Sequence, residues 1–457
     1  MMMQFKKYDR YKDSGVQWLG EIPEHWEVSR LRNIFSFSKG LTITKENLQE
    51  EGVYCVNYGE IHSKFGFEVN PEIHELKCVS EEYLLSDSNS LLSKGDFVFA
   101  DTSEDIEGSG NFTYLNSDLS TFAGYHTVIA RLKIHVNERF AAYVITSQSF
   151  RNQIRSRVKG VKVFSITQTL LKTVTFWFPN AEEQTAIANF LDDKTAKIDQ
   201  AITQKEKLIA LLKERKQILI QNAVTGKWSM VNGQWSMTPK EKLKDSGVEW
   251  IGQIPVGWEV VANRILFKER KEPGREDLPL LSVSIHSAVS SEELSDEDNI
   301  RGLIKIEDKS NYKYVAINDI VFNMMRAWQG AIGAVRVEGM VSPAYVVAKP
   351  NKKIVASYFE YQYRTDSFIQ QMNRNSKGIT DFRKRLYWDE FKQLQTVLPP
   401  QNEQLGIVAH IETQSAKIDQ AITLQQTQIE KLKEYKATLI DSAVTGKIKV
   451  TDETSQS

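Results

Sequence analysis

The sequence predicts a duplicated protein, in which two related but divergent domains alternate with two long helices. Three observations predict it. Blocks of near-identical sequence recur at matched places in the two halves, each copy ends in a segment with a seven-residue apolar repeat, and a 457-residue chain with 41% apolar residues is too long for one ordinary core. We therefore expect a pseudo-twofold internal repeat.

The recurring blocks mark the two ends of each copy. Asp13 to Pro23 returns as Asp245 to Pro255, a shift of 232 residues, and Ala196 to Thr203 returns letter for letter as Ala416 to Thr423, a shift of 220 residues. An Ala-Val-Thr-Gly-Lys segment closes both copies. Little identity survives between these blocks, which suggests one scaffold that carries two different binding surfaces.

The first long helix is predicted from Glu183 to Asn222. This segment contains neither Gly nor Pro and is rich in strong helix formers. Pro179 precedes it, and Gly226 follows its end, where a left-handed cap residue belongs. The second helix is predicted near Glu403 to Ser442. Forty helical residues span about 60 Å.

A seven-residue apolar repeat on both helices predicts that they pair as a coiled coil within the chain. Polar Lys205 and Gln425 occupy equivalent positions in this seam, as register-fixing interruptions often do. The alternative is that each helix only covers a globular domain, but the outward positions are mainly Lys, Glu, Gln and Asp, which leaves a narrow seam. The predicted helix-pair seam consists of Leu191, Ile198, Ile202, Ile209, Leu212, Leu219, Ile411, Ile418, Ile422, Ile429, Leu432 and Leu439.

Composition predicts a cytoplasmic protein without a membrane segment, a secretion signal or a disulfide framework. The chain has two cysteines, Cys55 and Cys78, and no apolar run near the roughly 20 residues of a membrane span. Its net charge is −1. Because nucleic-acid affinity depends on Lys and Arg at phosphates, a DNA site would need local basic clusters.

The search for catalytic motifs is negative. The Thr-Gly-Lys segments at 225–227 and 445–447 end helices, lack the upstream Gly and are not followed by Ser or Thr, so they are interpreted as helix caps and not as phosphate loops. The seven histidines show no zinc spacing, so no metal site is expected. Methyltransferase and hydrolase boxes are absent from the sequence. A scattered set of nuclease carboxylates stays open as an alternative.

Local basic clusters do occur, at corresponding places in the two halves. Residues 151–162 carry five basic residues and no acidic one, and polar side chains follow at 165–168. Solvated basic faces are common, but the recurrence in both halves favours DNA binding. The candidate DNA-binding residues are Arg151, Arg155, Arg157, Lys159, Lys162, Thr167, Gln168, Arg326, Gln329, Arg374, Lys377, Thr380, Arg383, Lys384 and Arg385.

Four tryptophans belong to the repeated frame: Trp18, Trp26, Trp250 and Trp258. Stacking on bases is one interpretation. However, two surfaces that bind different sequences would share residues only for structural reasons, so we expect these side chains to pack inside the protein.

The repeated motifs resemble those of a known family, the specificity subunits of type I restriction–modification enzymes. The opening block with its Trp-Leu/Ile-Gly-x-Ile-Pro-x-x-Trp pattern resembles the start of that family's target recognition domains. Pro179 to Gln184 with Ile187, and Pro400 to Gln404 with Ile407, resemble the head of its conserved helical regions. The match covers essentially the whole chain.

The resemblance implies a mixed α/β fold for each of the two target recognition domains, with an antiparallel pair of long helices between them. It implies recognition domains at 1–178 and 244–398, helical regions at 179–227 and 399–447, a linker at 228–243 and a disordered tail at 448–457. The recognition domains differ so much within the family that no DNA-contacting residue transfers by motif.

The resemblance also implies the function and partners of the chain. Each domain would bind one half of a split target on double-stranded DNA, and the divergence of the two domains predicts an asymmetric target. Two methyltransferase subunits and the restriction subunits would assemble with a non-catalytic chain. S-adenosylmethionine, ATP and Mg would be bound by those partners, and no cofactor by this chain.

Three alternatives stay open. A regulator with two DNA-binding heads would bind DNA tightly alone, a scaffold would bind proteins through both domains, and a self-sufficient methyltransferase would need cofactor and catalytic boxes that the sequence lacks.

Overall fold

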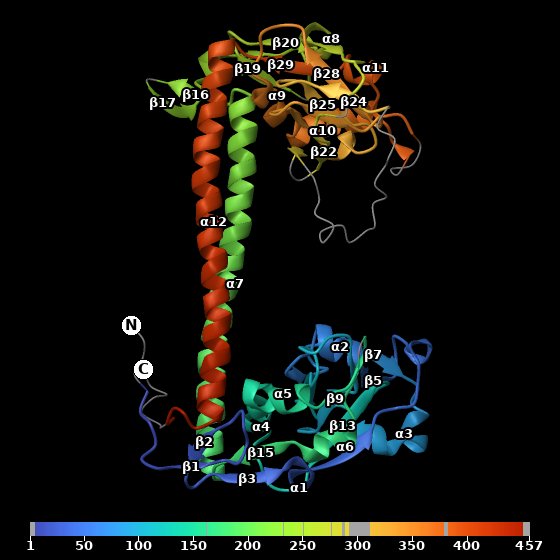
Figure 1. Cartoon of the computed structure of the whole chain (residues 1–457), viewed down its shortest axis with the longest axis vertical. Coiled ribbons are helices and arrows are strands. Elements are labelled where there is room, and N and C mark those ends of the chain that lie inside the picture. The colour runs from blue at the N-terminus through green and yellow to red at the C-terminus, as the bar shows by residue number, and fades with distance from the viewer. Residues whose placement is uncertain are drawn as a thin grey trace. The chain divides into compact units, whose positions relative to one another are not determined.

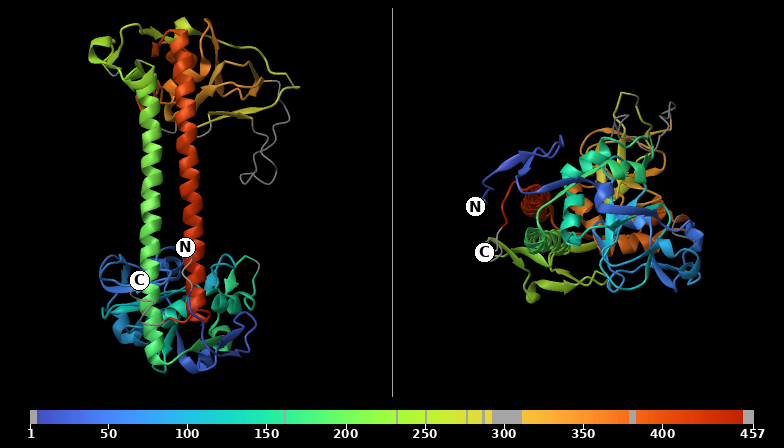
Figure 2. Two further views of the ribbon diagram at one scale, coloured as in Figure 1. Left: turned by 90° about the vertical axis from the view of Figure 1, so that its left-hand side faces the viewer. Right: turned by 90° about the horizontal axis from the view of Figure 1, so that it is seen from below.

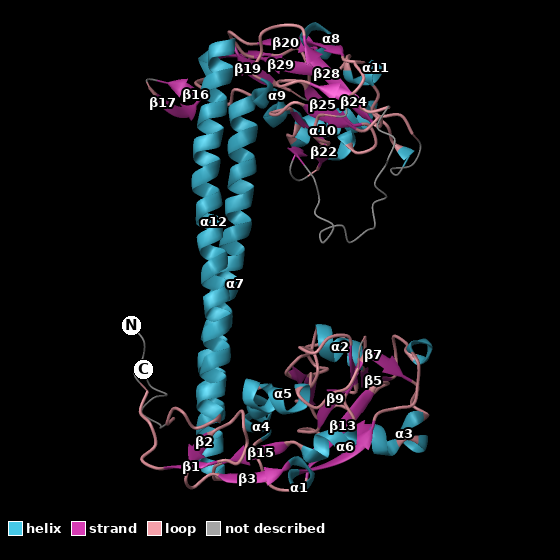
Figure 3. Ribbon diagram, viewed as in Figure 1, coloured by secondary structure: helices cyan, strands magenta, loops and turns pink. Residues whose placement is uncertain are grey.

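The computed structural model describes residues 5–160, 162–231, 233–249, 251–275, 277–285, 288–291, 311–378 and 383–450. The chain divides into two compact units, one formed by residues 1–205 and 427–457 and the other by residues 206–426. Each unit contains one α/β domain and a part of each long helix (Figures 1 and 3). The mixed α/β fold predicted from the resemblance is confirmed.

Two sheets build the domain of the first unit. The larger has, in spatial order, β4 (Phe35–Lys39), β13 (Thr127–Leu132), β9 (Phe97–Ala100), β11 (Phe112–Leu115) and β6 (Glu68–Val69). The smaller has β7 (Lys77–Val79), β5 (Val53–Val56), β12 (Thr121–Ala123) and β8 (Leu91–Leu92). All four residues of β9 are buried, as expected for a strand that is covered on both faces.

Shorter elements complete this domain. Three two-stranded ribbons pair β1 (Tyr11–Asp13) with β2 (Glu21–Pro23), β3 (Glu27–Arg30) with β15 (Thr175–Phe178), and β10 (Thr102–Ser103) with β14 (Phe164–Ser165). The short helices are α1 (Leu31–Ile34), α2 (Tyr58–Ser63), α3 (Tyr83–Ser86), α4 (Glu138–Thr146), α5 (Gln148–Arg155), α6 (Gln168–Thr173), η1 (Lys45–Asn47) and η2 (Ser88–Ser90).

The second unit repeats this plan with a smaller central sheet, in the order β21 (Phe267–Glu269), β28 (Tyr345–Pro350), β25 (Ile320–Asn323) and β26 (Ile332–Ala334). Its ribbons are β16 (Trp228–Val231) with β17 (Gln234–Met237), β18 (Leu243–Asp245) with β19 (Gln253–Pro255), β20 (Glu259–Ala262) with β29 (Gln395–Leu398), β22 (Leu281–Ser284) with β23 (Ala288–Ser291), and β24 (Lys313–Val315) with β27 (Gly339–Val341). Its short helices are α8 (Asn263–Leu266), α9 (Ala356–Tyr363), α10 (Asp366–Asn375), α11 (Trp388–Phe391), η3 (Lys240–Lys242) and η4 (Ala327–Gln329).

The two long helices are α7 (Ala181–Val224) and α12 (Gln401–Val444), both unbroken in the left view of Figure 2. Each extends two residues beyond the predicted range at either end. Each is followed, two residues after its last residue, by a glycine with positive φ, Gly226 at 72° and Gly446 at 71°, as the cap interpretation of the Thr-Gly-Lys segments predicts.

Ion pairs show that the helices run antiparallel in each unit. In the first unit Lys436 Nζ lies 2.7 Å from both carboxylate oxygens of Asp199, and in the second Lys216 Nζ lies 2.8 and 2.7 Å from those of Asp419. By the 220-residue shift, Asp199 corresponds to Asp419 and Lys216 to Lys436. The same ion pair therefore forms twice, with the aspartate on α7 in one unit and on α12 in the other. Lys205, the predicted polar seam residue, donates to Gln428 Oε1 on the opposite helix.

None of the predicted seam residues is exposed. Seven are buried, namely Leu191, Ile198, Ile202, Ile411, Ile418, Ile429 and Leu439, and five are half-buried, namely Ile209, Leu212, Leu219, Ile422 and Leu432. Two of them also contact a domain, because Leu219 and Ile411 pack in the hydrophobic core of the second unit.

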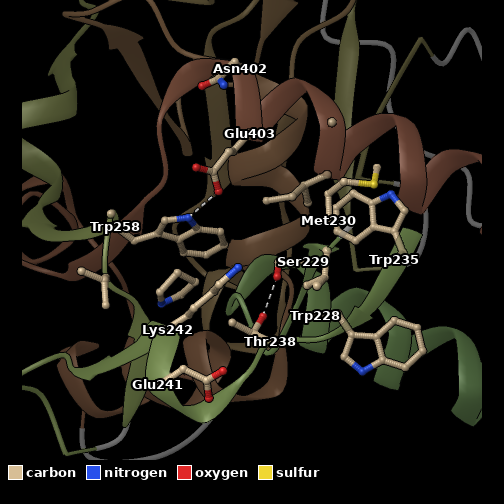
Figure 4. Close-up of a pocket in the computed structure, with 16 residues that line it drawn as sticks. Trp228, Ser229, Met230, Trp235, Thr238, Glu241, Lys242, Trp258, Asn402 and Glu403 are labelled. Carbon is tan, nitrogen blue, oxygen red and sulfur yellow. Dashed lines mark hydrogen bonds between the residues drawn. The ribbon is translucent and has the colours of Figure 1, made fainter. Parts of the chain in front are cut away.

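Hydrogen bonds that repeat in both copies fix the helix ends to the domains. Gln184 Oε1 accepts a hydrogen bond from Asn137 N over 2.8 Å, and Gln404 Oε1 accepts one from Val355 N over 2.9 Å. The frame residues Trp26 and Trp258 are buried, as predicted, and Trp258 Nε1 donates to Glu403 on α12 (Figure 4). Trp18 is exposed, so the prediction that it packs inside the protein is wrong, and Trp250 lies outside the described residues.

Two predicted segments are folded differently from expectation. The linker at 228–243 contains the β16–β17 hairpin, which packs on α12 through Trp235 stacked 4.1 Å from His410. In the tail at 448–450, Lys449 N donates to Lys6 O over 2.8 Å and Val450 is buried, so these three residues are ordered by contact with the N-terminal segment. Residues 451–457 lie outside the described range.

Candidate nucleic-acid interface

Helix α5 carries two of the predicted basic residues in half-buried positions. Arg151 and Arg155 are one helical turn apart, and both donate to the carbonyl oxygen of Glu107, over 3.5 and 2.5 Å. Their side chains therefore bind the loop that follows β10 in addition to facing the surface.

Arg151 also begins a chain of hydrogen bonds. Its Nη1 donates to Asn111 Oδ1 over 2.9 Å, the Asn111 amide donates to His62 Nδ1 over 2.8 Å, and His62 Nε2 lies 2.8 Å from Thr102 O. Because Nδ1 accepts a hydrogen bond, the proton of the neutral imidazole sits on Nε2 and is donated to the carbonyl. Arg151 thus helps to position His62 through Asn111.

The same two arginines face a basic hollow of about 560 Å³ that includes Lys433 and Lys436 of α12. Burial, with a further contribution from the charge of Arg155, lowers the pKa of Arg151 to about 10. The buried Nε atoms of both arginines have no hydrogen-bond partner within the described residues. Asp199 lines the hollow as well, where it pairs with Lys436. The positive charges of Arg151, Arg155 and Lys433 would attract an anion such as a DNA phosphate into the hollow.

The remaining predicted residues of the first half lie on the segment between α5 and α6. Arg157, Lys159 and Lys162 are exposed. Thr167 accepts a hydrogen bond from Leu170 N over 3.1 Å as the cap of α6, which is a structural role, and half-buried Gln168 begins that helix.

A polar hollow of about 550 Å³ next to this segment was not predicted from the sequence. Its lining includes Tyr58, His62, Asp105, Asn111 and His126. Histidine, asparagine, tyrosine and aspartate can all hydrogen-bond to base edges. No single motif marks these residues, since they come from α2 and from loops far apart in the chain.

In the second half the structure brings two predicted segments together. Arg326 and Gln329 are exposed on the η4 turn, and Lys384 Nζ lies 5.3 Å from the ring centroid of Trp328 in that turn. Leu386 N donates to Met324 O over 2.9 Å, which joins the backbones of the two segments.

The other basic residues of this half surround the same place. Arg374 is exposed in the last turn of α10, and exposed Lys377 pairs with Glu390 at 2.5 Å. Arg383 is exposed, and half-buried Arg385 donates to Lys384 O over 2.9 Å. Thr380 lies outside the described residues.

The two candidate surfaces occupy equivalent positions of the scaffold. In the first half Ile166 N donates to Asp101 O over 2.7 Å, which matches the bond between Leu386 and Met324 in the second half. The side chains around these bonds differ. His, Tyr and acidic residues gather in the first half, whereas Arg, Lys and Trp gather in the second.

Metal and membrane features are absent from the part of the chain that the structure describes. Within the described ranges no group of three His, Cys, Asp or Glu residues could hold a metal ion. No helix found among those residues is both long and apolar enough to cross a membrane. Cys55 and Cys78 are both buried, free thiols.

Comparison with known proteins identifies relatives over the full length. A family model for the type I restriction modification DNA specificity domain matches residues 23–210. The chain is similar to the putative type I restriction enzyme MjaX specificity subunit of Methanocaldococcus jannaschii, with 23% identity over 98% of this chain and 99% of the relative. It is also similar to the EcoKI specificity subunit of Escherichia coli K12, with 22% identity over 88% of this chain and 84% of the relative.

Solved structures share the fold. The HsdS subunit of Thermoanaerobacter tengcongensis aligns with a TM-score of 0.51 at 14% identity, covering 93% of this chain and 98% of the other. A chain from a structure on complex assembly and conformational transition of the type I R-M system aligns over the same shares, with a TM-score of 0.61 at 14% identity.

Proposed function

Because the chain belongs to the family of type I restriction–modification specificity subunits, whose members recognise DNA and are non-catalytic, we propose that it binds a two-part, asymmetric DNA sequence. One observation supports this proposal above the others. The two domains share a scaffold and present differing side chains at the same place on it, around Asp101 and Ile166 and around Met324 and Leu386.

The basic residues would divide between two tasks. The hollow formed by Arg151, Arg155 and Lys433 would take a backbone phosphate, which positions the DNA without specifying its sequence. The η4 turn with Arg326 and Gln329 would contact base edges, since arginine pairs with guanine and glutamine with adenine in the major groove.

The helix pair would set the gap between the two half-sites. Each helix has 44 residues, which corresponds to about 66 Å of length. Two methyltransferase subunits would dock on the helical regions, and restriction subunits would join them. S-adenosylmethionine, ATP and Mg would be bound by these partners, whereas this chain would bind none of them.

The test is to co-express the chain with a methyltransferase subunit of its own system and to map methyladenine across the host genome. Methylation at one split, asymmetric sequence that disappears when this gene is deleted is the expected result. Unchanged methylation after deletion, with an active partner, would contradict the proposal and favour a DNA-binding regulator.

A domain exchange locates the specificity. Replacing residues 244–398 by the equivalent domain of a relative is expected to change one half-site and leave the other and the gap unchanged. A change in both half-sites would contradict the assignment of one half-site to each domain.

A further inference from the structure

We propose that His126 determines specificity by accepting a hydrogen bond from the exocyclic amino group of an adenine or a cytosine in the first half-site. This role rests on the proposed function, because it requires DNA bound to the first domain. His126 lines the polar hollow of about 550 Å³, together with Tyr58, Asp105 and Asn111. Its imidazole is held there with one ring nitrogen open.

Asp101 fixes which nitrogen of His126 carries the proton. His126 Nδ1 lies 3.2 Å from Asp101 Oδ1. Because a carboxylate only accepts, Nδ1 of the neutral ring carries the proton and Nε2 carries a lone pair. Among the described residues no hydrogen bond to Nε2 is found, and the side chain of His126 is 57% exposed. Nε2 is therefore an acceptor that is open to a ligand.

Aromatic packing holds this imidazole in place. The ring of His126 packs edge-on against Tyr58 with 5.3 Å between centroids, and Tyr58 packs edge-on against His62 at 6.2 Å. His62 is itself held, because its Nδ1 accepts from Asn111 and its Nε2 donates to Thr102 O. An acceptor that is positioned before DNA arrives can discriminate between bases that differ in one donor.

The lining of the hollow favours a base over a phosphate. Glu104 and Asp105 line it, and no Lys or Arg is found among the described residues of its lining. Carboxylates repel a phosphate, whereas carboxylates and a neutral imidazole nitrogen both accept hydrogen bonds from amino groups. In the major groove these groups are N6 of adenine and N4 of cytosine, whereas guanine and thymine present acceptors there.

Cations lie next to the hollow on the segment that follows α5. Lys159 and Lys162 are exposed, and Lys162 directly precedes Val163, which lines the hollow. The pairing of β10 with β14, in which Thr102 lies opposite Ser165, keeps this segment beside the hollow. Acceptors next to exposed lysines are the arrangement expected where a protein contacts a base edge and the adjoining phosphates.

The second domain has a different residue at the same place of the scaffold. Asp101 N donates to His126 O over 3.0 Å, and Met324 N donates to Ala344 O over 3.2 Å. Since Asp101 and Met324 are equivalent, Ala344 occupies the position of His126, and its side chain has no acceptor. Two half-sites of different sequence require such a difference on a common frame.

The backbone at His126 determines which variants are informative. Its φ is 54°, in the left-handed region that His and Asn enter more often than other non-glycine residues. His126→Asn suits this backbone and keeps a donor to Asp101, but has no atom at the place of Nε2. His126→Gln, with some backbone strain, brings an amide oxygen to that place. The first variant removes the acceptor, and the second restores it.

The experiment combines these variants with changed DNA, in methyltransferase complexes that contain the full chain. The first half-site is the one that exchange of residues 244–398 leaves unchanged. Each of its adenines and cytosines is replaced in turn by purine or 2-pyrimidinone, which lack the amino group. At one position the wild-type complex is expected to lose about tenfold in affinity. There the His126→Asn complex should lose nothing further, and the His126→Gln complex should again lose affinity.

Asp101→Asn supplies a second variant, which leaves His126 in place. The amide nitrogen of the new residue can donate to Nδ1, which moves the ring proton to Nε2 and turns the acceptor into a donor. The loss caused by removing the same amino group should then fall to about threefold or less.

Replacements in the second half-site are the internal control and should cost all the complexes the same affinity. Variants that melt and assemble like the wild type, but remain as sensitive as the wild type to every amino group of the first half-site, would overturn the role of His126 alone. A wild-type chain that directs methylation to no split sequence would instead overturn the proposed function.

Discussion

The hollow between α5 and α12 leads to a measurable prediction about DNA affinity. It contains four cations, of which Lys436 is neutralised by Asp199. Replacing two of the remaining three, by Arg155→Gln and Lys433→Gln, removes most of its uncompensated charge. The carbonyl oxygen of Glu107 would still accept a hydrogen bond from Arg151, so the loop that contains Glu107 should keep its position.

The magnitude follows from counterion release. Each lost phosphate contact reduces the slope of log affinity against log salt by about 0.9, so the double variant should lose about 2 in slope if both side chains contact phosphate. Fluorescence anisotropy of labelled DNA, from 50 to 200 mM salt with the assembled complex, measures this slope. The loss should be the same for specific and non-specific DNA, because phosphates carry no sequence information.

A matched control exists within the chain. Lys213 occupies in α7 the position that Lys433 has in α12, but Ile369 and Asn373 stand where the first half has Arg151 and Arg155. Lys213→Gln should therefore change the slope less than Lys433→Gln. Equal slopes for these two single variants, or a loss of affinity for the specific sequence alone, would refute the assignment of the hollow to a phosphate.

Three further predictions concern stability and topology. Gly446→Ala should destabilise by about 2–4 kcal/mol in thermal melting, because its φ is 71° and a Cβ would lie 2.3 Å from Pro23 Cδ, whereas Gly15→Ala, with φ 67° and open space, should cost only the backbone part. Burial lowers the pKa of His410, so its stacking on Trp235 should be stable above pH 6.5 and weaken as the pH falls through the lowered pKa. Tryptophan fluorescence should report this change, and His410→Phe, which introduces the residue type of the first copy, should abolish it. Joining Ser457 to Met1 and opening the chain in the β16–β17 turn should preserve DNA binding and melting temperature. The reason is that the two terminal segments are hydrogen-bonded, from Lys449 N to Lys6 O, as the two strands of that hairpin are. A circularly permuted chain that fails to fold would contradict this equivalence.

Local sequence patterns predicted the helices closely, and the reason is physical. A helix depends on its own periodicity and caps, so the range from Glu183 to Asn222 came within two residues of α7 at each end. The sequence predicts a linker at 228–243 and not the hairpin at 228–237, because the packing of that hairpin on His410 of α12 is a contact between residues distant in sequence.

The candidate interface was less accessible to sequence reasoning. A count of basic residues found Arg151 and Arg155 but not their bonds to Glu107, because that loop lies more than forty residues away. The hollow around His62 and His126 was missed for the same reason, since it is assembled from separate loops. Charge clustering identifies cations and not what they contact.

The two exchanged ion pairs, Lys436 with Asp199 and Lys216 with Asp419, have a consequence for how such chains can diversify. Each helix carries both a lysine and an aspartate, so either one contains all the complementary positions for an antiparallel copy of itself. A half-length polypeptide ending in α12 is therefore expected to associate with an identical half, and such a homodimer would bind an inverted repeat. Gene fusion of unlike halves across this shared seam would then create new asymmetric targets without redesign of the joint.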